Sequence, residues 1–250
     1  MRNYITHFLK GRAKLVVLCM VSVFAIVPQV FGQTTPAPYE PAKVYLVQQG
    51  PTPGRSGDFW NGLEGTIVDK RPWGGTAADS ATGVFYLAVD SKNLYLRAEV
   101  KDASPNLRRA NQDPTTFWNG TSCEIFFSTR LGNSTGYAKE HSHIAFVVAD
   151  AGNGAYKVLA QKDNKVLTAE QCQAAVVEWA DKSYIIEAAI PHAVAGISGA
   201  LAAGQAVRCE FRINYAPKGR NRSLIVNWRE PGDEGHKNPS KWSDGVLVAK

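Results

Sequence analysis

The sequence predicts an all-β protein: an antiparallel β-sandwich of the jelly-roll type with at most one short helix, preceded by a signal peptide. Three observations favour this fold class. Short strand-like segments recur from residue 83 onward, turn residues separate most of them, and a single stretch is a candidate helix. Many short strands with turn signals between them are typical of sandwiches and barrels.

The predicted strands begin with a hairpin, in which "GVFYLAVD" and "NLYLRAEVKD" flank the turn "DSKN". The later strand patterns are, in order, "TSCEIFFSTR", "HIAFVVAD", "YKVLAQK", "QAAVVEWA", "SYIIEAAIP", "AVRCEFRINYA", "SLIVNW" and "GVLVAK". The candidate helix is "HAVAGISGALAAG". Residues 196–204 are equally compatible with a loop, because the glycines there weaken a helix.

The N-terminus, residues 1–32, has the layout of a secretory signal peptide. Basic residues precede the apolar run "LVVLCMVSVFAIVPQVF", and Val30 and Gly32 supply small residues before a cleavage site. A membrane anchor is less favoured, because Pro28 interrupts a run that would need about 20 apolar residues. A lipoprotein anchor is disfavoured because Cys19 follows Leu18, not a small residue. We therefore expect a secreted, periplasmic or cell-surface protein.

The rest of the chain is predicted to contain one domain. Residues 33–54, which begin with "QTTPAPYEPA", form a proline-rich lead-in in this prediction. Residues 55–250 form the sandwich, since no linker or internal repeat divides them. No catalytic domain is recognised in the sequence, so we expect a free-standing domain or one that docks with separate partners.

The charge of the chain argues against one class of partner. The whole chain has 28 basic and 22 acidic residues, a formal net charge of +6. Because the leader holds four basic residues and no acidic one, the mature chain would keep 24 basic residues against 22 acidic ones. No block of like charges indicates a nucleic-acid surface. After cleavage of the leader, no membrane span is expected.

Three cysteines remain after the predicted cleavage: Cys123, Cys172 and Cys209. Export permits disulfides, but the odd number leaves at least one thiol free or bonded to another chain. Cys123 and Cys209 take inward positions in the strand pattern, where cysteine usually serves as a small apolar residue. The sequence leaves the pairing open, including a bond between Cys172 and Cys209.

Alternation in two strands predicts a polar outer face of the sheet. In "TSCEIFF" and "AVRCEFRINYA", inward apolar residues alternate with outward ones that include Glu124, Arg212 and Asn214. Alternation alone favours an ordinary solvated surface. The other interpretation is a sugar-binding surface, because carboxylate, guanidinium and amide groups beside flat aromatic rings suit carbohydrate.

Four segments occur in an order that resembles a known family. They are "ATGVFYLAVDSKNLYLRAEVKDASP", "FWNGTSCEIFFSTR", "SYIIEAAIPHAV" and "FRINYAPKGRNRSLIVNWREPGDEGHKNPSKWSDGVLVAK". The second resembles the tryptophan–glycine–aspartate–x–x–glutamate strand of the family 9 carbohydrate-binding modules, within the DOMON-like group of sandwiches. The third is similar to their glutamate–x–x–isoleucine–proline segment. The resemblance covers roughly residues 55–250.

The resemblance implies a non-catalytic carbohydrate-binding protein in which two tryptophans clamp a sugar. Trp118 matches the first tryptophan and Glu124 matches the strand glutamate. Trp228 in "IVNWREPG" is the best match for the second tryptophan. Arg212 and Asn214 would add hydrogen bonds to the sugar hydroxyls.

The resemblance also implies a ligand class and partners. The ligands of the family are typically the ends of β-linked glucans and xylans, and its members accompany glycan-degrading enzymes. Members often bind structural calcium, for which Asp79, Asp90 and Asp102 lie in suitable loops. The sequence alone supplies no set of six to eight oxygen ligands. Two positions depart from the family pattern, since Thr121 replaces an aspartate and His192 an aromatic residue.

Two other function classes stay open. A glycan-active enzyme would need two carboxyl groups about 5–10 Å apart, and the outward pair Glu124 and Glu210 is a candidate. An adhesion module without a sugar ligand is the other. His141 and His143 share a strand face, but we interpret them as an exposed, solvated pair because no third metal ligand is evident. A haem held by methionine and histidine is disfavoured, since both methionines lie in the leader.

Overall fold

The computed structural model describes residues 40–250, except for 76–79, 107, 110–112 and 218–219. The predicted signal peptide, residues 33–39 of the lead-in and the calcium candidate Asp79 therefore lie outside the described residues. Within the described part, no helix has both the length and the apolar character that a membrane span requires.

The described residues fold mainly into strands, as the sequence predicted. The strands are β1 (Ala42–Leu46), β2 (Thr66–Val68), β3 (Lys70–Gly74), β4 (Ala81–Val89), β5 (Asn93–Asp102), β6 (Arg108–Arg109), β7 (Ser122–Ser128), β8 (His141–Gly152), β9 (Ala155–Lys162), β10 (Lys165–Val166), β11 (Gln173–Ala180), β12 (Ser183–Pro191), β13 (Ala206–Tyr215), β14 (Leu224–Asn227) and β15 (Ser243–Ala249). Two 3-10 turns are η1 (Pro114–Asn119) and η2 (Pro239–Lys241).

The one α-helix of the described residues is α1 (His192–Ala195), at the start of the predicted helical stretch. It ends at Gly196, which has φ 72° and donates its backbone N–H to the carbonyl of His192. Glycine readily adopts a positive φ, so Gly196 ends the helix at this position. For the part of the chain that the structure describes, the expectation of at most one short helix is confirmed.

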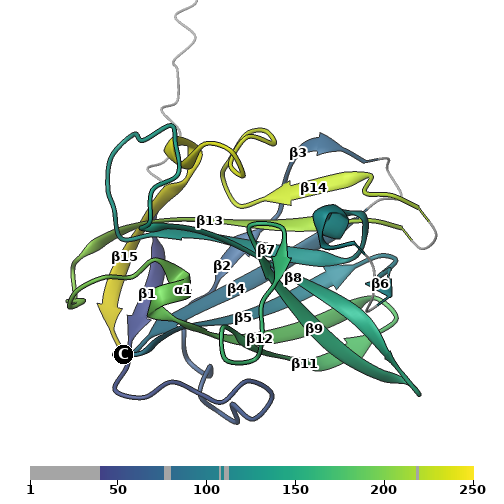
Figure 1. The fold of residues 1–250 in the computed structure, drawn as a ribbon, viewed down its shortest axis with the longest axis horizontal. Helices are drawn as coiled ribbons and strands as arrows, with labels where there is room; N and C mark the ends of the chain where they lie inside the picture. The colour runs from purple at the N-terminus through teal and green to yellow at the C-terminus, as the bar shows by residue number, and fades with distance from the viewer. Residues whose placement is uncertain (1–39, 76–79, 107, 110–112, 218–219) are drawn as a thin grey trace, which may run out of the picture. The chain divides into compact units, whose positions relative to one another are not determined.

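The strands form one curled sheet with the order β10-β9-β8-β7-β13-β15-β1-β4-β5-β12-β11. Strands β2, β3, β6 and β14 attach beside this path. The sheet folds back on itself, so that β4 packs against β13 (Figure 1). The rings of Phe85 in β4 and Phe211 in β13 lie 5.1 Å apart. Both rings are 1% exposed or less, and the apolar faces of the two layers enclose the main core. The prediction of a sandwich is confirmed.

The sandwich begins earlier than the predicted residue 55. Strand β1, which falls within the predicted lead-in, pairs with β15 on one side and β4 on the other. Both pairings are parallel, so the sheet is not wholly antiparallel. Parallel neighbours come from distant parts of a chain, and the local pattern of residues 42–46 carries no signal of them.

Strands β7 and β13 are buried on both faces, which corrects the expectation of a solvated outer face. Glu124 and Arg212 are each 1% exposed and Asn214 is fully buried. Two segments lie over this face of the strands: the ring of Trp242, after η2, lies 5.6 Å from that of Phe126, and the ring of Tyr137 lies 5.7 Å from that of Trp242. Alternation shows which side chains share a face, but it does not show which loops fold over that face.

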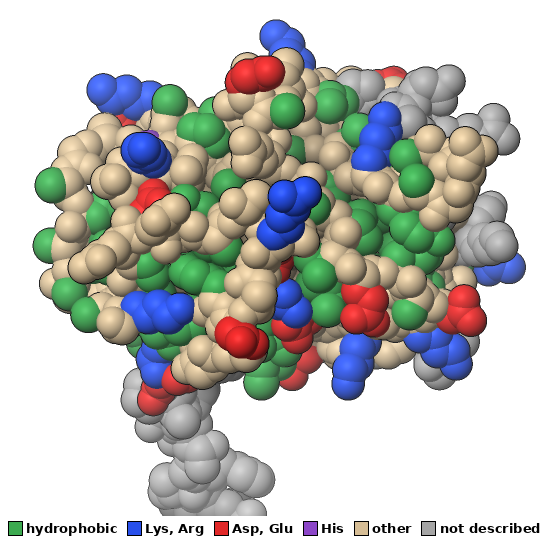
Figure 2. Space-filling view, turned by 90° about the horizontal axis from the view of Figure 1, so that it is seen from below, with side chains coloured by type: hydrophobic (Ala, Val, Ile, Leu, Met, Phe, Trp, Pro, Cys, Tyr) green, Lys and Arg blue, Asp and Glu red, His purple; other side chains and the backbone are tan. Residues whose placement is uncertain are grey.

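All three cysteines of the described residues are free and buried. Burial raises the pKa of the Cys172 thiol to about 12, so the reactive thiolate is disfavoured. These cysteines therefore serve as small packing residues. The surface is mixed in charge on the side shown in Figure 2, where basic and acidic side chains are interspersed.

Candidate functional site

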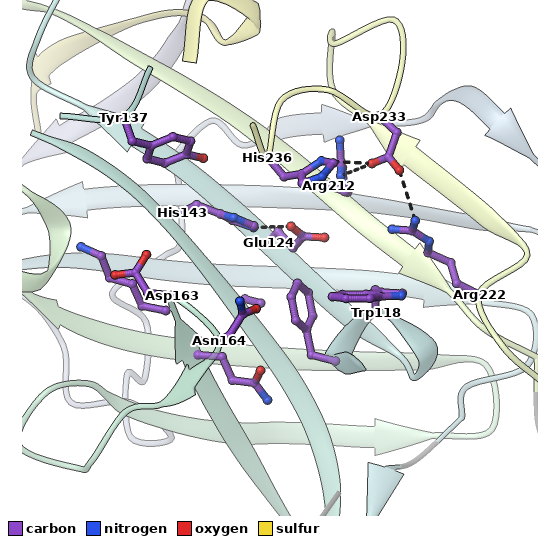
Figure 3. Close-up of a pocket in the computed structure, with 14 residues that line it drawn as sticks. Trp118, Glu124, Tyr137, His143, Asp163, Asn164, Arg212, Arg222, Asp233 and His236 are labelled. Atoms are coloured by element: carbon purple, nitrogen blue, oxygen red, sulfur yellow. Dashed lines mark hydrogen bonds and ion pairs between the residues drawn. The ribbon is translucent and has the colours of Figure 1, made fainter. Parts of the chain in front are cut away.

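A pocket of about 530 Å³ opens over the covered polar face of β7 and β13 (Figure 3). This volume lies in the range of small-molecule sites. Aromatic rings and side chains of both charge signs line it: Phe117, Trp118, Glu124, Tyr137, His143, Ala145, Gln161, Lys162, Asp163, Asn164, Arg212, Arg222, Asp233 and His236.

Glu124 lies in the floor of the pocket, and neighbouring strands hold it in place. It is opposite Arg212 in the β7–β13 register and opposite Ala145 in the β7–β8 register, so these side chains share one face. Its Oε1 accepts a hydrogen bond from Nδ2 of Asn214 at 2.5 Å, and its Oε2 contacts Nε2 of His143. The carboxylate is therefore fixed in orientation by two partners.

Glu124 is ionised despite its burial. Burial opposes its ionisation, but the interactions with His143, the charge of Arg212 and the Asn214 amide outweigh that effect and lower the pKa of Glu124 to about 2. At ordinary pH the side chain is therefore a pure hydrogen-bond acceptor in the pocket floor.

Arg212 is a buried cation with carboxylate partners on the 228–238 segment. Its Nη2 donates to Oε2 of Glu230 at 2.8 Å and its Nη1 to Oδ1 of Asp233 at 2.6 Å. Its Nε donates to Oδ1 of Asn227 at 3.0 Å. A buried charge is tolerated only when it is paired and hydrogen-bonded in this way. The pairing fixes the guanidinium beside Glu124.

Arg222 and Asp233 continue this network toward the rim. Arg222 donates from Nη1 to Oδ1 of Asn214 at 3.0 Å and from Nη2 to Oδ2 of Asp233 at 3.2 Å. Burial opposes ionisation of Asp233, but hydrogen bonding to His236 and the charges of Arg212 and Arg222 lower its pKa to about 2. The network joins floor and rim into one rigid set of donors and acceptors.

The turn η1 carries the aromatic wall formed by Phe117 and Trp118. Asp113 caps the turn, because its Oδ1 accepts the backbone N–H of Thr115 at 2.8 Å and a proline follows it directly. The two rings meet edge to face, with centroids 5.3 Å apart and planes at 78°. Each ring therefore supports the other, and Trp118 is held at one end of the pocket (Figure 3).

Tyr137 and the β9–β10 hairpin form the remaining walls. Tyr137 lies at the other end of the pocket from Trp118 in Figure 3 and is 43% exposed. The hairpin turns at Asp163 and Asn164, with φ 52° and 60°. Asp and Asn accept this left-handed geometry, which two-residue hairpin turns demand. Both side chains are presented at the rim.

The structure brings three of the five predicted site residues to the pocket: Trp118, Glu124 and Arg212. Asn214 lies behind them, where it joins Glu124 to Arg222. Trp228 is not among the lining residues.

Trp228 is 8% exposed and packs in the main core against Phe211, with ring centroids 5.6 Å apart. Asn227 shares the buried polar face with Arg212, so alternation turns the next residue, Trp228, to the core face.

The pocket also contains residues that sequence reasoning missed. His143 is bonded to Glu124 and His141 is 5% exposed with its ring edge-on to Trp242, which corrects the interpretation of both as a solvated pair. Tyr137 and Asp233 come from irregular segments, and no periodic signal marks such residues. The one available signal was the position of His143 on a strand adjacent to Glu124.

The two calcium candidates in the described residues are engaged in turns. Asp90 accepts from the backbone N–H groups of Lys92 and Asn93 and from the hydroxyl of Tyr95. Asp102 is 1% exposed, and its burial raises the pKa to about 6. The described residues contain no group of three or more His, Cys, Asp or Glu side chains that could hold a metal ion.

The pocket joins aromatic rings to a fixed network of donors and acceptors. Residues 53–250 match the family described as "Carbohydrate family 9 binding domain-like". The chain belongs to this family. The resemblance inferred from sequence motifs is thereby confirmed, and the matched range covers the strands that build the pocket.

Curated relatives of this family 9 domain are much longer proteins. The chain is 28% identical over 203 residues to endo-1,4-beta-xylanase A of Thermotoga neapolitana, with 78% of this chain covered. It is 24% identical over 216 residues to exoglucanase XynX of Acetivibrio thermocellus, with 84% covered. The chain spans only 17% and 18% of the length of these relatives.

Two solved structures show the same fold. One is a family 9 carbohydrate-binding module from Caldicellulosiruptor kristjanssonii in complex with cellotriose, with a TM-score of 0.64 and 22% identity. The comparison covers 84% of this chain and 95% of that one. The other, a module from the same organism in complex with glucose, has a TM-score of 0.60 and 22% identity and covers 83% and 96% of the two chains.

Proposed function

We propose that this family 9 domain binds a neutral sugar in the pocket and does not cleave it. The observation that carries the proposal is the position of Trp118 beside the ionised Glu124 and the paired Arg212. A sugar ring has an apolar C–H face, which packs on an indole, and hydroxyl groups at its edge, which need acceptors and donors.

The rigidity of the polar groups favours recognition of a specific ligand. Glu124, Arg212 and Asp233 are each held by protein partners before any ligand arrives. Groups fixed in advance lose little conformational entropy on binding, which increases affinity. The pocket therefore supports a defined arrangement of hydroxyls.

The charge balance of the pocket favours a neutral ligand. Its cations Lys162, Arg212 and Arg222 are matched in number by the acids Glu124, Asp163 and Asp233. Several are already paired with each other or with nearby protein groups. An anionic sugar would compete with these carboxylates for the arginines, so uncharged sugars such as glucose and cellotriose suit the site better.

The acids of the site argue against catalysis. A glycosidase needs a protonated acid beside a second carboxylate, but the pKa values of Glu124 and Asp233 are both lowered to about 2. Burial raises the pKa of Glu210 to about 7, yet its Oε1 accepts the backbone N–H groups of Trp228 and Arg229, and it is not a lining residue.

Calorimetric titration of the purified protein with glucose and cellotriose tests this function. We expect Trp118→Ala to weaken binding by about 1–3 kcal/mol, the usual cost of losing a central aromatic contact. Tyr156→Ala is the control, because Tyr156 is 40% exposed and lies five residues along β9 from Gln161, about 17 Å away. Equal affinity in folded Trp118→Ala, or release of glucose from cellotriose, would refute the proposal.

We also propose that the protein is exported and acts beside glycan-degrading enzymes. Its curated relatives, named as a xylanase and an exoglucanase, support this partnership. Mass spectrometry of the protein from its native host should give a mature chain that starts at Gln33. A chain that keeps residues 1–32 would contradict export by cleavage.

A further inference from the structure

An exposed tryptophan lies next to the pocket without being one of its lining residues. Trp73 in β3 is 47% exposed. Strand β3 pairs with β14, where Trp73 is opposite Ile225, and β14 pairs in turn with β13 (Figure 1). The sheet thus extends beyond the pocket floor and carries a large aromatic surface there. Half-exposed indoles of this kind are enriched at binding surfaces.

Arg222 links this tryptophan directly to the pocket. Its Cζ lies over the ring of Trp73, 5.4 Å from the centroid, and its Nη2 reaches Oδ2 of Asp233 at 3.2 Å. Its backbone N–H donates to Oδ1 of Asn119, the residue after Trp118, at 3.4 Å. One arginine therefore forms the boundary between the lined pocket and the exposed indole.

This arrangement orients an arginine and leaves indole surface free. The cation over the ring and the pairing with Asp233 fix the guanidinium. Arg222 lines the pocket and also contacts Trp73, so a half-exposed aromatic group adjoins the residue at the edge of the pocket.

We propose that Trp73 and Arg222 form a second sugar position, which holds the unit next to the one in the pocket. The proposal rests on the proposed sugar-binding function and specifies its ligand as a chain of at least two units. Trp73 contacts the apolar face of the second unit, and Arg222 donates to a hydroxyl near the linkage. The domain then distinguishes an oligosaccharide from a single sugar.

A comparison of the affinities for cellotriose and for glucose tests this position. We expect Trp73→Ala to lower the affinity for cellotriose about three- to tenfold, as the loss of an aromatic contact would. The affinity of Trp73→Ala for glucose should stay within about twofold of that of the unmutated protein, since the pocket itself is intact. Trp73→Phe should restore part of the cellotriose affinity. Tyr156→Ala serves as the matched exposed control.

Each other outcome overturns the proposal and has a distinct meaning. An equal loss for glucose and cellotriose would show that Trp73 acts only by supporting Arg222 in the pocket. Unchanged affinity for both sugars would show that the indole makes no contact. In either case a loss of both sugars in Trp118→Ala would leave the proposed function standing. A parent that binds neither sugar would refute the function and this position together.

Discussion

The two faces of β7 and β13 are equally buried but chemically opposite. On one face Ile125, Phe211 and Ile213 pack in the core of the sandwich. On the other, Glu124 and Arg212 lie under loops in a hydrogen-bonded network that forms the pocket floor. Burial alone therefore does not separate core from site. The two faces differ in how their side chains interact. Those of the core pack as apolar groups, and those of the site form directional hydrogen bonds and ion pairs.

Arg212→Ala should give the largest effect, because it removes the most buried cation of the polar face and leaves buried Glu230 without its ion-pair partner. We expect a loss of about 3–5 kcal/mol in unfolding free energy, with loss of sugar binding. Chemical denaturation and calorimetry measure the two. On the core face, Phe211→Leu should cost no more than about 1.5 kcal/mol and keep the affinity. Equal losses of unfolding free energy and of sugar affinity in both variants would show that the two faces do not differ in this way.

Glu124→Gln, compared with Glu187→Gln, should separate loss of sugar binding from loss of stability. The amide keeps the shape of the side chain but loses the charged acceptor, so sugar affinity should fall by about 1.5–3 kcal/mol. Glu187→Gln is the control: this carboxylate is also buried, but it pairs with Arg97 and Ser56 away from the lining residues. Its sugar affinity should match the parent. If Glu187→Gln lost sugar affinity to the same extent, the effect of Glu124→Gln would be attributed to a change in folding.

Acid should destabilise the polar face selectively. The pKa of Glu124 falls from its ordinary 4.5 to about 2 in the folded protein, so its charged form stabilises the fold above pH 4.5. This contribution is lost as the pH falls from 4.5 toward 2. Denaturant midpoints measured across this range should decline less steeply for Glu124→Gln than for the parent. Equal slopes would show that the carboxylate is not stabilised by its neighbours.

Trp228→Phe should give the smallest effect, and it tests whether Trp228 lies in the core or in the sugar site. A ring remains to pack on Phe211, so we expect a loss of at most about 1.5 kcal/mol in unfolding free energy and no change in sugar affinity. Thermal denaturation and titration measure both. A fall in affinity greater than tenfold with unchanged stability would return Trp228 to the site.

The sequence predicted the sandwich and the pocket floor because both depend on local periodicity. Strand alternation placed Glu124 and Arg212 on one face, and the family motif added Trp118 six residues before Glu124. The covering of that face by Tyr137 and Asp233 was not predictable in this way. Those residues lie in irregular segments, whose positions depend on long-range contacts, not on periodicity.

The same distinction explains Trp228. A motif match identifies a residue type near a strand end, but a shift of one residue turns its side chain to the opposite face. Because Asn227 faces the network, Trp228 faces the core. The parallel pairing of β1 escaped prediction for a related reason, since its partners lie more than 35 residues away.

The position of β15 between β1 and β13 makes it the strand that joins the two parts of the sheet. It fits closely, since a Cβ at Gly245 would meet Sγ of Cys209 at 2.9 Å. A chain truncated before residue 243 would expose two unpaired edges at once, one along β1 and one along the first residues of β13. Such edges are templates for pairing with another molecule. Loss of residues 243–250, which include all seven residues of β15, would therefore make the domain prone to aggregate.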